Sequence, residues 1–330
     1  MNTELKQSKF ALYALFVLAL NIIVILWGAF LRASLSGDGC GQHWLTCGGE
    51  VVPSAPQFKT VVEFTHRLST GLVFFTVLYL WVWSFRKYEK GNFLRKTAFA
   101  SFAFVIVEAL IGAGLVLTGN TAGNWTPTRP LWTIAHLITT FSLLAALVLT
   151  VQLARSEKGF DFKKLNFSGL PRKVFIFLSV AMAGIFLVGA SGSIAALSSM
   201  IFPSSSLAQG VAKDFAETSH ILLRLRVSHP ILSVSLGVYL LFLASWLKAR
   251  MSENVEINRW ANVLSVLVLI QLAAGVLTLL TLAPIVLQLV HLLLADLLWL
   301  AFVLLSANVL AESGEVEAVS RPVKIQSAIS

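Results

Sequence analysis

Four histidines lie inside long apolar segments, where polar side chains are costly and usually functional. They are His66, His136, His229 and His291. Paired imidazoles from facing helices are typical axial ligands of haem iron. A zinc or copper site would need further ligands, and the sequence offers no cysteine or methionine at a matching depth. The pattern predicts two haem sites with two histidines each, although any single one of these histidines could instead serve a helix–helix hydrogen bond.

Glu63 stands three residues before His66, and residues at this spacing share one face of a helix. A carboxylate there could act on a ligand of the first histidine pair. Alternatively, it could stabilise the N-terminus of its helix at the membrane interface. Arg226, and not an acid, occupies the corresponding place before His229. This difference predicts one reactive haem site and one cofactor site.

Other ionisable residues accompany the histidines. Glu108 and Asp296 lie within apolar segments and could relay protons or only form hydrogen bonds inside the bundle. Arginine binds carboxylates in a bidentate manner, so arginines near the expected outer interface are candidates for contacts with haem propionates, with ordinary snorkelling as the alternative. These arginines are Arg67, Arg129, Arg224 and Arg226. We expect His43 and His220 to lie in solvated loops.

Both cysteines of the chain, Cys40 and Cys47, lie in one stretch with the sequence CGQHWLTC, which follows the first apolar segment. The outer side of a bacterial membrane is oxidising, so we predict a disulfide between them. The bond could simply staple the loop, or it could take part in redox exchange or in the transfer of haem.

Membrane-spanning helices must position these residues. Hydrophobic residues make up 57% of the 330-residue chain and charged residues only 12%, whereas a soluble domain has about 25% charged residues. Because about 20 apolar residues cross the hydrocarbon layer, we predict an all-α integral membrane protein with eight spans. The approximate spans are 10–32, 62–85, 97–118, 130–153, 174–201, 225–247, 259–282 and 286–310. The last two are divided at Pro284, since proline cannot continue a helix interior.

The positive charge of the chain is distributed between alternate loops. Most of the 25 lysines and arginines fall on the side that holds both termini when the N-terminus is placed inside. The positive-inside rule then predicts cytoplasmic termini and histidines near the outer face. The formal net charge of +9 is explained by these loops, so we do not expect a nucleic-acid partner.

A weak internal repeat relates the two halves of the chain. Gly28 and Gly189 lie in similar tetrapeptides, and Gly114 and Gly275 lie in another pair at the same offset. Four helices per repeat place both halves in the same direction, which is a parallel repeat. We therefore predict two four-helix bundles, with the haem sites divided between residues 1–160 and residues 161–330.

Several of these segments resemble the haem A synthase family across nearly the whole chain. The resemblance rests on the CGQHWLTC loop, on Glu63-Phe64-Thr65-His66-Arg67, and on a histidine early in the fourth span. Two longer segments continue it, FPSSSLAQGVAKDFAETSHILLRLRVSHP and LAPIVLQLVHLLLADLLWLAFVLL. The cysteine loop departs from the family, because Gln42-His43-Trp44-Leu45 stands where members often have an Asp-Trp-Pro core.

The resemblance implies an enzyme that converts haem O to haem A by stepwise oxidation of a ring methyl to a formyl group. It implies that His66 and His136 hold the substrate haem, with Glu63 important for the chemistry. It also implies that His229 and His291 ligate a haem b cofactor.

The expected setting is the bacterial inner membrane. The partners expected there are the lipid bilayer, a haem O synthase as donor and an electron acceptor that the sequence does not identify. A homo-oligomer is also compatible with the sequence. Two other classes remain open on the histidines alone: a dihaem b-type cytochrome that passes electrons from quinol, and a transporter that uses the histidines as relay groups.

Overall fold

The computed structural model describes residues 8–121, 123, 125–155 and 171–320, and within these it contains eight helices long and apolar enough to span a membrane. The predicted all-α membrane fold is therefore confirmed, and the chain is a multi-pass membrane protein. The spans are α1 (Lys9–Ala33), α2 (Phe58–Lys87), α3 (Phe93–Leu117), α4 (Arg129–Arg155), α5 (Arg172–Ile201), α7 with α8 (Ile221–Arg226 and Ser228–Arg250), α9 (Val255–Leu280) and α10 (Ile285–Ser320).

Polar caps start several of these helices. The Ser8 hydroxyl accepts the Ala11 N–H at 3.2 Å before α1, and the Asn92 side chain accepts the Leu94 N–H at 2.9 Å before α3. Such caps satisfy backbone donors that have no partner within the helix. The spans begin within four residues of the predicted positions, and those of α2, α3, α7 with α8, and α9 each begin four residues earlier than expected.

The predicted break before Pro284 is present between α9 and α10. Leu282 and Ala283 adopt positive φ angles of 61° and 56°, and the Ala283 N–H donates to the Thr278 carbonyl at 2.7 Å. A residue before proline disfavours the right-handed helical conformation, so the chain turns here instead of continuing the helix. The turn lets α10 return antiparallel along α9.

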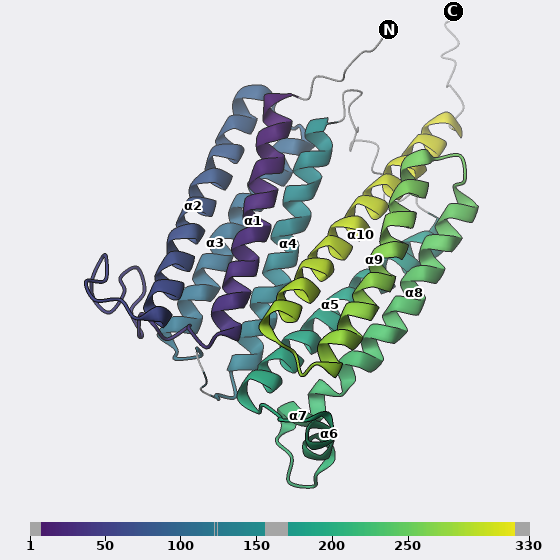
Figure 1. The fold of residues 1–330 in the computed structure, drawn as a ribbon. Helices are drawn as coiled ribbons and strands as arrows, with labels where there is room; N and C mark the ends of the chain where they lie inside the picture. The colour runs from purple at the N-terminus through teal and green to yellow at the C-terminus, as the bar shows by residue number, and fades with distance from the viewer. Residues whose placement is uncertain (1–7, 122, 124, 156–170, 321–330) are drawn as a thin grey trace, which may run out of the picture.

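The spans gather into two groups (Figure 1). In the first, α1 to α4 pack as a closed set in which each helix contacts its neighbours and α4 returns to α1. In the second, α5 packs on α7 and α8, α8 on α9, and α9 on α10. This arrangement is compatible with the predicted pair of four-helix bundles. The expected boundary at residue 160 lies outside the described residues.

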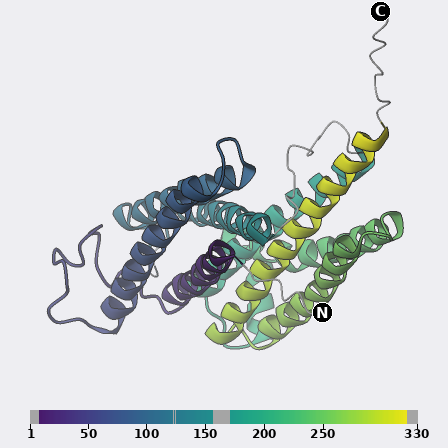
Figure 2. The same ribbon diagram turned by 90° about the horizontal axis from the view of Figure 1, so that it is seen from above.

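Helices α4 and α10 connect the two groups, and the view from above shows them between the outer helices (Figure 2). The Trp299 indole N–H donates to the Phe141 carbonyl at 2.7 Å, and the two rings stack with centroids 5.4 Å apart. Phe186 of α5 meets the edge of Trp299 at 5.4 Å. These aromatic contacts fix how the two groups meet.

The connection between α5 and α7 carries structure that the sequence did not predict. A short helix, α6 (Leu207–Phe215), lies in the connection between α5 and α7. It lies at the same end of the molecule as the loop between α1 and α2 (Figure 1). Both connections therefore border the ends of the spans that carry the four histidines.

Candidate haem-binding sites

His229 of α8 and His291 of α10 face each other in the second group of helices. Their ring centroids are 6.4 Å apart and the ring planes are nearly perpendicular, at 89°. Two imidazoles on one metal ion need ring centres about 6 Å apart, because each metal–nitrogen bond is about 2 Å and each nitrogen is about 1 Å from its ring centre. The observed separation matches axial ligation of one haem iron.

The nitrogen atoms of these rings have different surroundings. The Ser191 hydroxyl lies 3.1 Å from His229 Nδ1, which leaves Nε2 of that ring for another ligand. In His291, Nδ1 is buried and has no hydrogen-bond partner within the described chain, and Nε2 lies 3.4 Å from the Gln271 amide nitrogen. A buried polar atom without a partner is unusual, and a ligand would satisfy it. The donor set therefore fits haem iron.

Glycines lie against three of the four histidine rings. A Cβ added at Gly28 would lie 2.8 Å from His66 Cε1, and one at Gly192 would lie 2.9 Å from His229 Cε1. A Cβ added at Gly275 would lie 3.2 Å from His291 Cε1. These helices approach the imidazoles so closely that only glycine leaves room for the rings.

The spatial repeat differs from the one predicted from sequence. Gly189, the predicted counterpart of Gly28, faces Leu137 and Phe141 of α4, so the residue that corresponds to Gly28 at a histidine is Gly192. Gly114, the predicted counterpart of Gly275, faces Trp132 and not a histidine. The offset between the tetrapeptides therefore does not describe the glycine contacts at the histidines. Which face of a helix meets a histidine depends on the rotation of that helix about its axis.

The first histidine pair has a carboxylate beside it. His66 Nδ1 is buried without a hydrogen-bond partner in the described chain, and the ring lies within electrostatic range of His136. His136 Nδ1 lies 2.6 Å from Glu108 Oε2, in a direction that does not meet hydrogen-bond geometry. Glu108 of α3 thus lies against the His136 ring, and His66 lies within electrostatic range of that ring.

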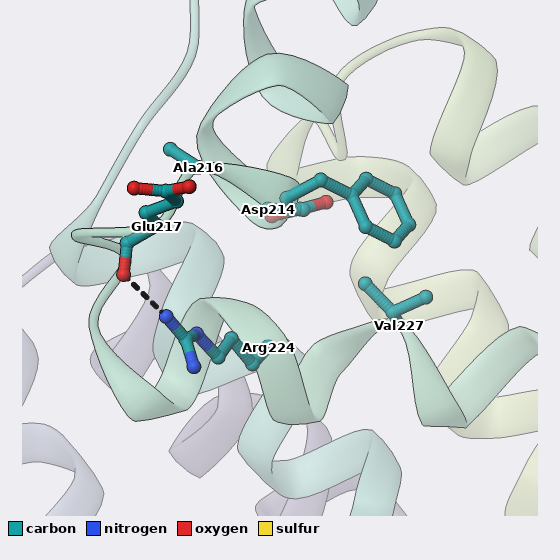
Figure 3. Close-up of a pocket in the computed structure, with 6 residues that line it drawn as sticks. Asp214, Ala216, Glu217, Arg224 and Val227 are labelled. Atoms are coloured by element: carbon teal, nitrogen blue, oxygen red, sulfur yellow. Dashed lines mark hydrogen bonds between the residues drawn. The ribbon is translucent and has the colours of Figure 1, made fainter.

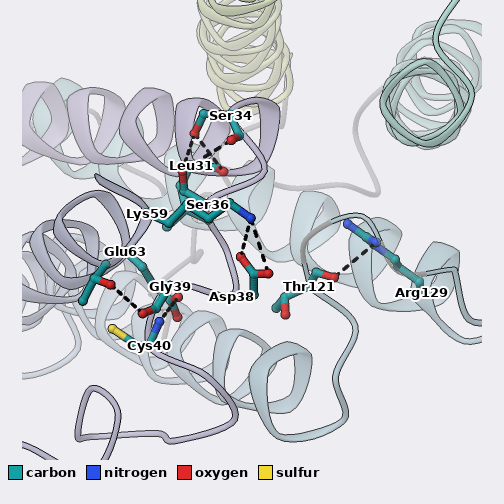
Figure 4. A network of polar contacts seen from close by, with 11 residues as sticks. Leu31, Ser34, Ser36, Asp38, Gly39, Cys40, Lys59, Glu63, Thr121 and Arg129 are labelled. Atoms are coloured by element: carbon teal, nitrogen blue, oxygen red, sulfur yellow. Dashed lines mark hydrogen bonds and ion pairs between the residues drawn. The ribbon is translucent and has the colours of Figure 1, made fainter. Parts of the chain in front are cut away.

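Glu63 lies beneath the cysteine loop and is only 3% exposed. One carboxylate oxygen accepts the Cys40 N–H at 2.8 Å (Figure 4), and the other accepts from the Arg67 guanidinium at 2.5 Å. Arg67 also donates to the carbonyls of His43 and Thr46, at 2.7 Å each. Glu63 and Arg67 therefore hold the loop on the first turns of α2, immediately before His66.

The predicted disulfide joins Cys40 to Cys47. The disulfide closes a short loop. A hydrogen bond also joins this loop to α2, because the Thr60 hydroxyl donates to the Gly39 carbonyl at 2.9 Å. On the exposed side, Lys59 pairs with Asp38 at 3.2 Å (Figure 4). The cysteine loop is thus anchored both covalently and by polar contacts to the helix that carries His66.

The four candidate arginines differ in their contacts. Arg129 is 3% exposed and its guanidinium donates to the Thr121 carbonyl at 3.5 Å (Figure 4). It lies within electrostatic range of Arg32, which is also close to His136. Sequence reasoning did not select Arg32, although its place at the outer end of α1 was a usable signal. These two cations beside the first histidine pair suit anionic propionates.

Arg224 and Arg226 lie in α7, at the start of the α7–α8 span of the second group. The Arg226 guanidinium pairs with Asp214 of α6 at 2.7 Å, so α6 brings an acid to the second half that sequence spacing did not place there. Arg224 donates to the Glu217 carbonyl at 2.5 Å, at the edge of a hollow of about 420 Å³ that also borders Asp214 and Val227 (Figure 3).

The sequence also singled out Asp296, His43 and His220. Asp296 is fully buried in α10, and neither carboxylate oxygen has a hydrogen-bond partner in the described chain. His43 is exposed, as expected of a loop residue. His220 was expected to be solvated, but it is half-buried: its Nδ1 accepts the Leu222 N–H and its ring meets the Trp125 edge at 4.6 Å.

Comparison with known proteins identifies relatives for nearly the whole chain. Residues 11–303 match the family described as cytochrome oxidase assembly protein (COX15-CtaA). The chain is 40% identical over 303 residues to a protein of Thermus thermophilus named protoheme IX farnesyltransferase, covering 92% of this chain and 49% of that protein.

Further relatives carry the name haem A synthase. The one from Bacillus cereus (strain 03BB102) is 26% identical over 277 residues, which is 82% of this chain and 83% of that protein. The one from Exiguobacterium sibiricum is 28% identical over 158 residues, or 48% of this chain and 50% of that protein. The chain thus spans about half the length of the Thermus relative. The resemblance to the haem A synthase family is confirmed.

Proposed function

Since the chain belongs to the cytochrome oxidase assembly protein family, we propose that it is an oxidoreductase of haem A biosynthesis, a haem A synthase that oxidises a ring methyl of haem O to a formyl group. The observation that carries this proposal is the facing pair His229 and His291, at the spacing expected for one iron between two imidazoles. A second, chemically different pair, His66 and His136, accompanies it in the other half. Two unequal haem sites suit one substrate and one cofactor.

In this proposal His229 and His291 hold haem b, which would supply one-electron transfer at that site. Ser191 orients the His229 ring through its contact with Nδ1, which keeps Nε2 directed away from α5. Gly192 and Gly275 let both rings lie close to the neighbouring helices. Arg224 and Arg226 would contact propionates from the start of the α7–α8 span.

His66 and His136 hold the substrate haem O in the first half. Arg129 and Arg67, already proposed from sequence, and Arg32 stand on the same side, where they would bind its propionates. Glu63 lies one turn before His66 and is the candidate catalytic carboxylate, which would stabilise positive charge at the methyl carbon as it is oxidised. Its contacts with Cys40 and Arg67 would make the cysteine loop part of the same site.

We further propose that the chain lies in a bacterial inner membrane, with both termini in the cytoplasm and the haem sites toward the outer face. A haem O synthase would deliver the substrate, and an electron acceptor would remove the electrons that methyl oxidation releases. The Thermus relative named for farnesyl transfer to protoheme IX supports a link with the preceding step, because this chain corresponds to about half of it.

Pigment analysis tests the proposal. The chain is produced in a bacterium that makes haem O but no haem A, and the extracted haems are separated by chromatography. We expect haem A to accumulate, and to disappear when His66 or His136 is replaced by alanine. The second candidate is a farnesyltransferase, which the 40% identity to the Thermus protein favours, and accumulation of haem O in a second host that makes protohaem but neither haem O nor haem A would identify it. A haem b spectrum with unchanged pigments would identify an electron-carrying cytochrome.

A further inference from the structure

The carboxylate of Glu108 is held against the helix that carries His136. Its Oε2 lies 2.6 Å from His136 Nδ1, and its Oε1 lies within hydrogen-bonding distance of the hydroxyls of Thr139 and Thr140, the latter at 3.1 Å. Each hydroxyl has one proton, which it shares between Glu108 and a backbone carbonyl one turn earlier. One face of α4 therefore presents an imidazole and two hydroxyls to a single carboxylate from α3.

The second half has an amide at the corresponding place. Gln271 of α9 lies beside His291 of α10, with its amide nitrogen 3.4 Å from Nε2 of that ring, whereas Glu108 of α3 approaches His136 of α4 at Nδ1. The positions three and four residues after His291 are Leu294 and Ala295, where α4 has its two threonines. Gln271 Oε1 is buried and has no hydrogen-bond partner within the described chain. The two histidines thus receive a charged carboxylate in one half and a neutral amide in the other.

We infer that Glu108 is a positioning residue for His136: it accepts the Nδ1–H, directs Nε2 toward the substrate haem iron and makes this ligand a stronger electron donor than His291. The inference rests on the proposed function, in which His136 ligates the substrate haem. A carboxylate behind a metal-bound imidazole fixes its tautomer and raises its basicity. Gln271 carries no charge and gives His291 no such support.

The ring of His136 has room to complete this contact. Its side chain is 44% exposed, whereas that of Glu108 is only 16% exposed. The short separation of Nδ1 and Oε2 already exists, and only their alignment is lacking. Rotation of the imidazole would align its Nδ1–H with the carboxylate that α3 and the two threonines hold in place.

Midpoint potentials of the bound haems test this assignment. Purified protein is loaded with haem O, and each haem is titrated while its absorbance and electron paramagnetic resonance are recorded. Glu108→Gln should raise the potential of the first-half haem and weaken its retention by about tenfold or more, with the second-half haem unchanged. Gln271→Glu should lower the midpoint potential of the second-half haem. Glu108→Asp keeps a carboxylate, so its first-half haem should have a potential between those of the unaltered protein and Glu108→Gln.

A role in packing alone predicts a different result. In that case Glu108→Gln would lower the protein yield or the haem content of both halves, and the haem that is still bound would keep its midpoint potential. This result would overturn the inference. If Glu108→Gln does not accumulate, the double variant Thr139→Val, Thr140→Val replaces it, since it frees the carboxylate without removing it. Unchanged potentials in that variant and in Gln271→Glu would also overturn the inference.

The outcome is separable from the proposed function. The potentials are measured on bound haem without turnover, so they report on Glu108 even if the protein makes no haem A. Conversely, haem A formation together with an unchanged first-half potential in Glu108→Gln would leave the proposed function standing and overturn the role of Glu108.

Discussion

Replacing Glu63 with glutamine should loosen the cysteine loop from α2. The native residue is 3% exposed and its carboxylate accepts from two donors, the Cys40 N–H at 2.8 Å and the Arg67 guanidinium at 2.5 Å. Glutamine keeps one acceptor oxygen and places an NH₂ donor where the second oxygen was, so at least one charge-assisted hydrogen bond is lost. Such a bond contributes about 1.5–3 kcal/mol, which corresponds to an increase of about 10- to 150-fold in the opening constant of the loop.

Hydrogen exchange measured by mass spectrometry is the assay. The peptide that contains Cys40 should exchange faster in Glu63→Gln by this factor, while peptides from the membrane-spanning part of α2 keep their rates. Asp38→Asn is the matched control in the same loop. Asp38 forms an ion pair with Lys59, and about half of each side chain is exposed to solvent. Exposed ion pairs of this kind contribute about 0–1 kcal/mol to stability.

Two results would refute this reasoning: equal exchange in Glu63→Gln and the unaltered protein, or an equal effect from Asp38→Asn. Haem A production by the same preparations then separates the two roles of Glu63. If activity falls in proportion to loop opening, Glu63 acts through the loop. If activity is lost while Thr60→Val, which loosens the loop by removing the hydroxyl that donates to the Gly39 carbonyl, retains a substantial part of it, the carboxylate acts on the substrate directly.

The packing around the histidines and between the two helix groups leads to three more predictions. Alanine at His229 or His291 should abolish the low-spin haem b absorbance or convert it to a high-spin spectrum, and an unchanged spectrum in both variants would end that assignment. Gly192→Ala should reduce haem b content, because its Cβ would lie 2.9 Å from an imidazole carbon, whereas Gly112→Ala meets nothing within 4 Å and should bind haem normally. Trp299→Phe removes the indole donor to a backbone carbonyl of α4 and should cost about 1 kcal/mol in a thermal unfolding assay; equal melting temperatures would contradict it.

The sequence alone was sufficient for the number of spans, and it singled out His229 and His291, which face each other in the structure. Span length depends on a local quantity, the run of apolar residues needed to cross the bilayer, and each such run is visible without knowledge of its neighbours. The turn between α9 and α10 is likewise local, because Pro284 restricts the residue before it. The cysteine pairing follows from two cysteines within one short loop.

Only the tertiary structure decided which residues face those histidines. A membrane helix that is apolar on nearly every side carries no stripe that marks its inward face, so the rotation of each helix is set by packing against its neighbours. For this reason the sequence did not identify Gly192 as the contact of His229, and it did not connect Glu108 with His136 or Gln271 with His291. These contacts join different helices, and the differences between the two histidine pairs depend on them.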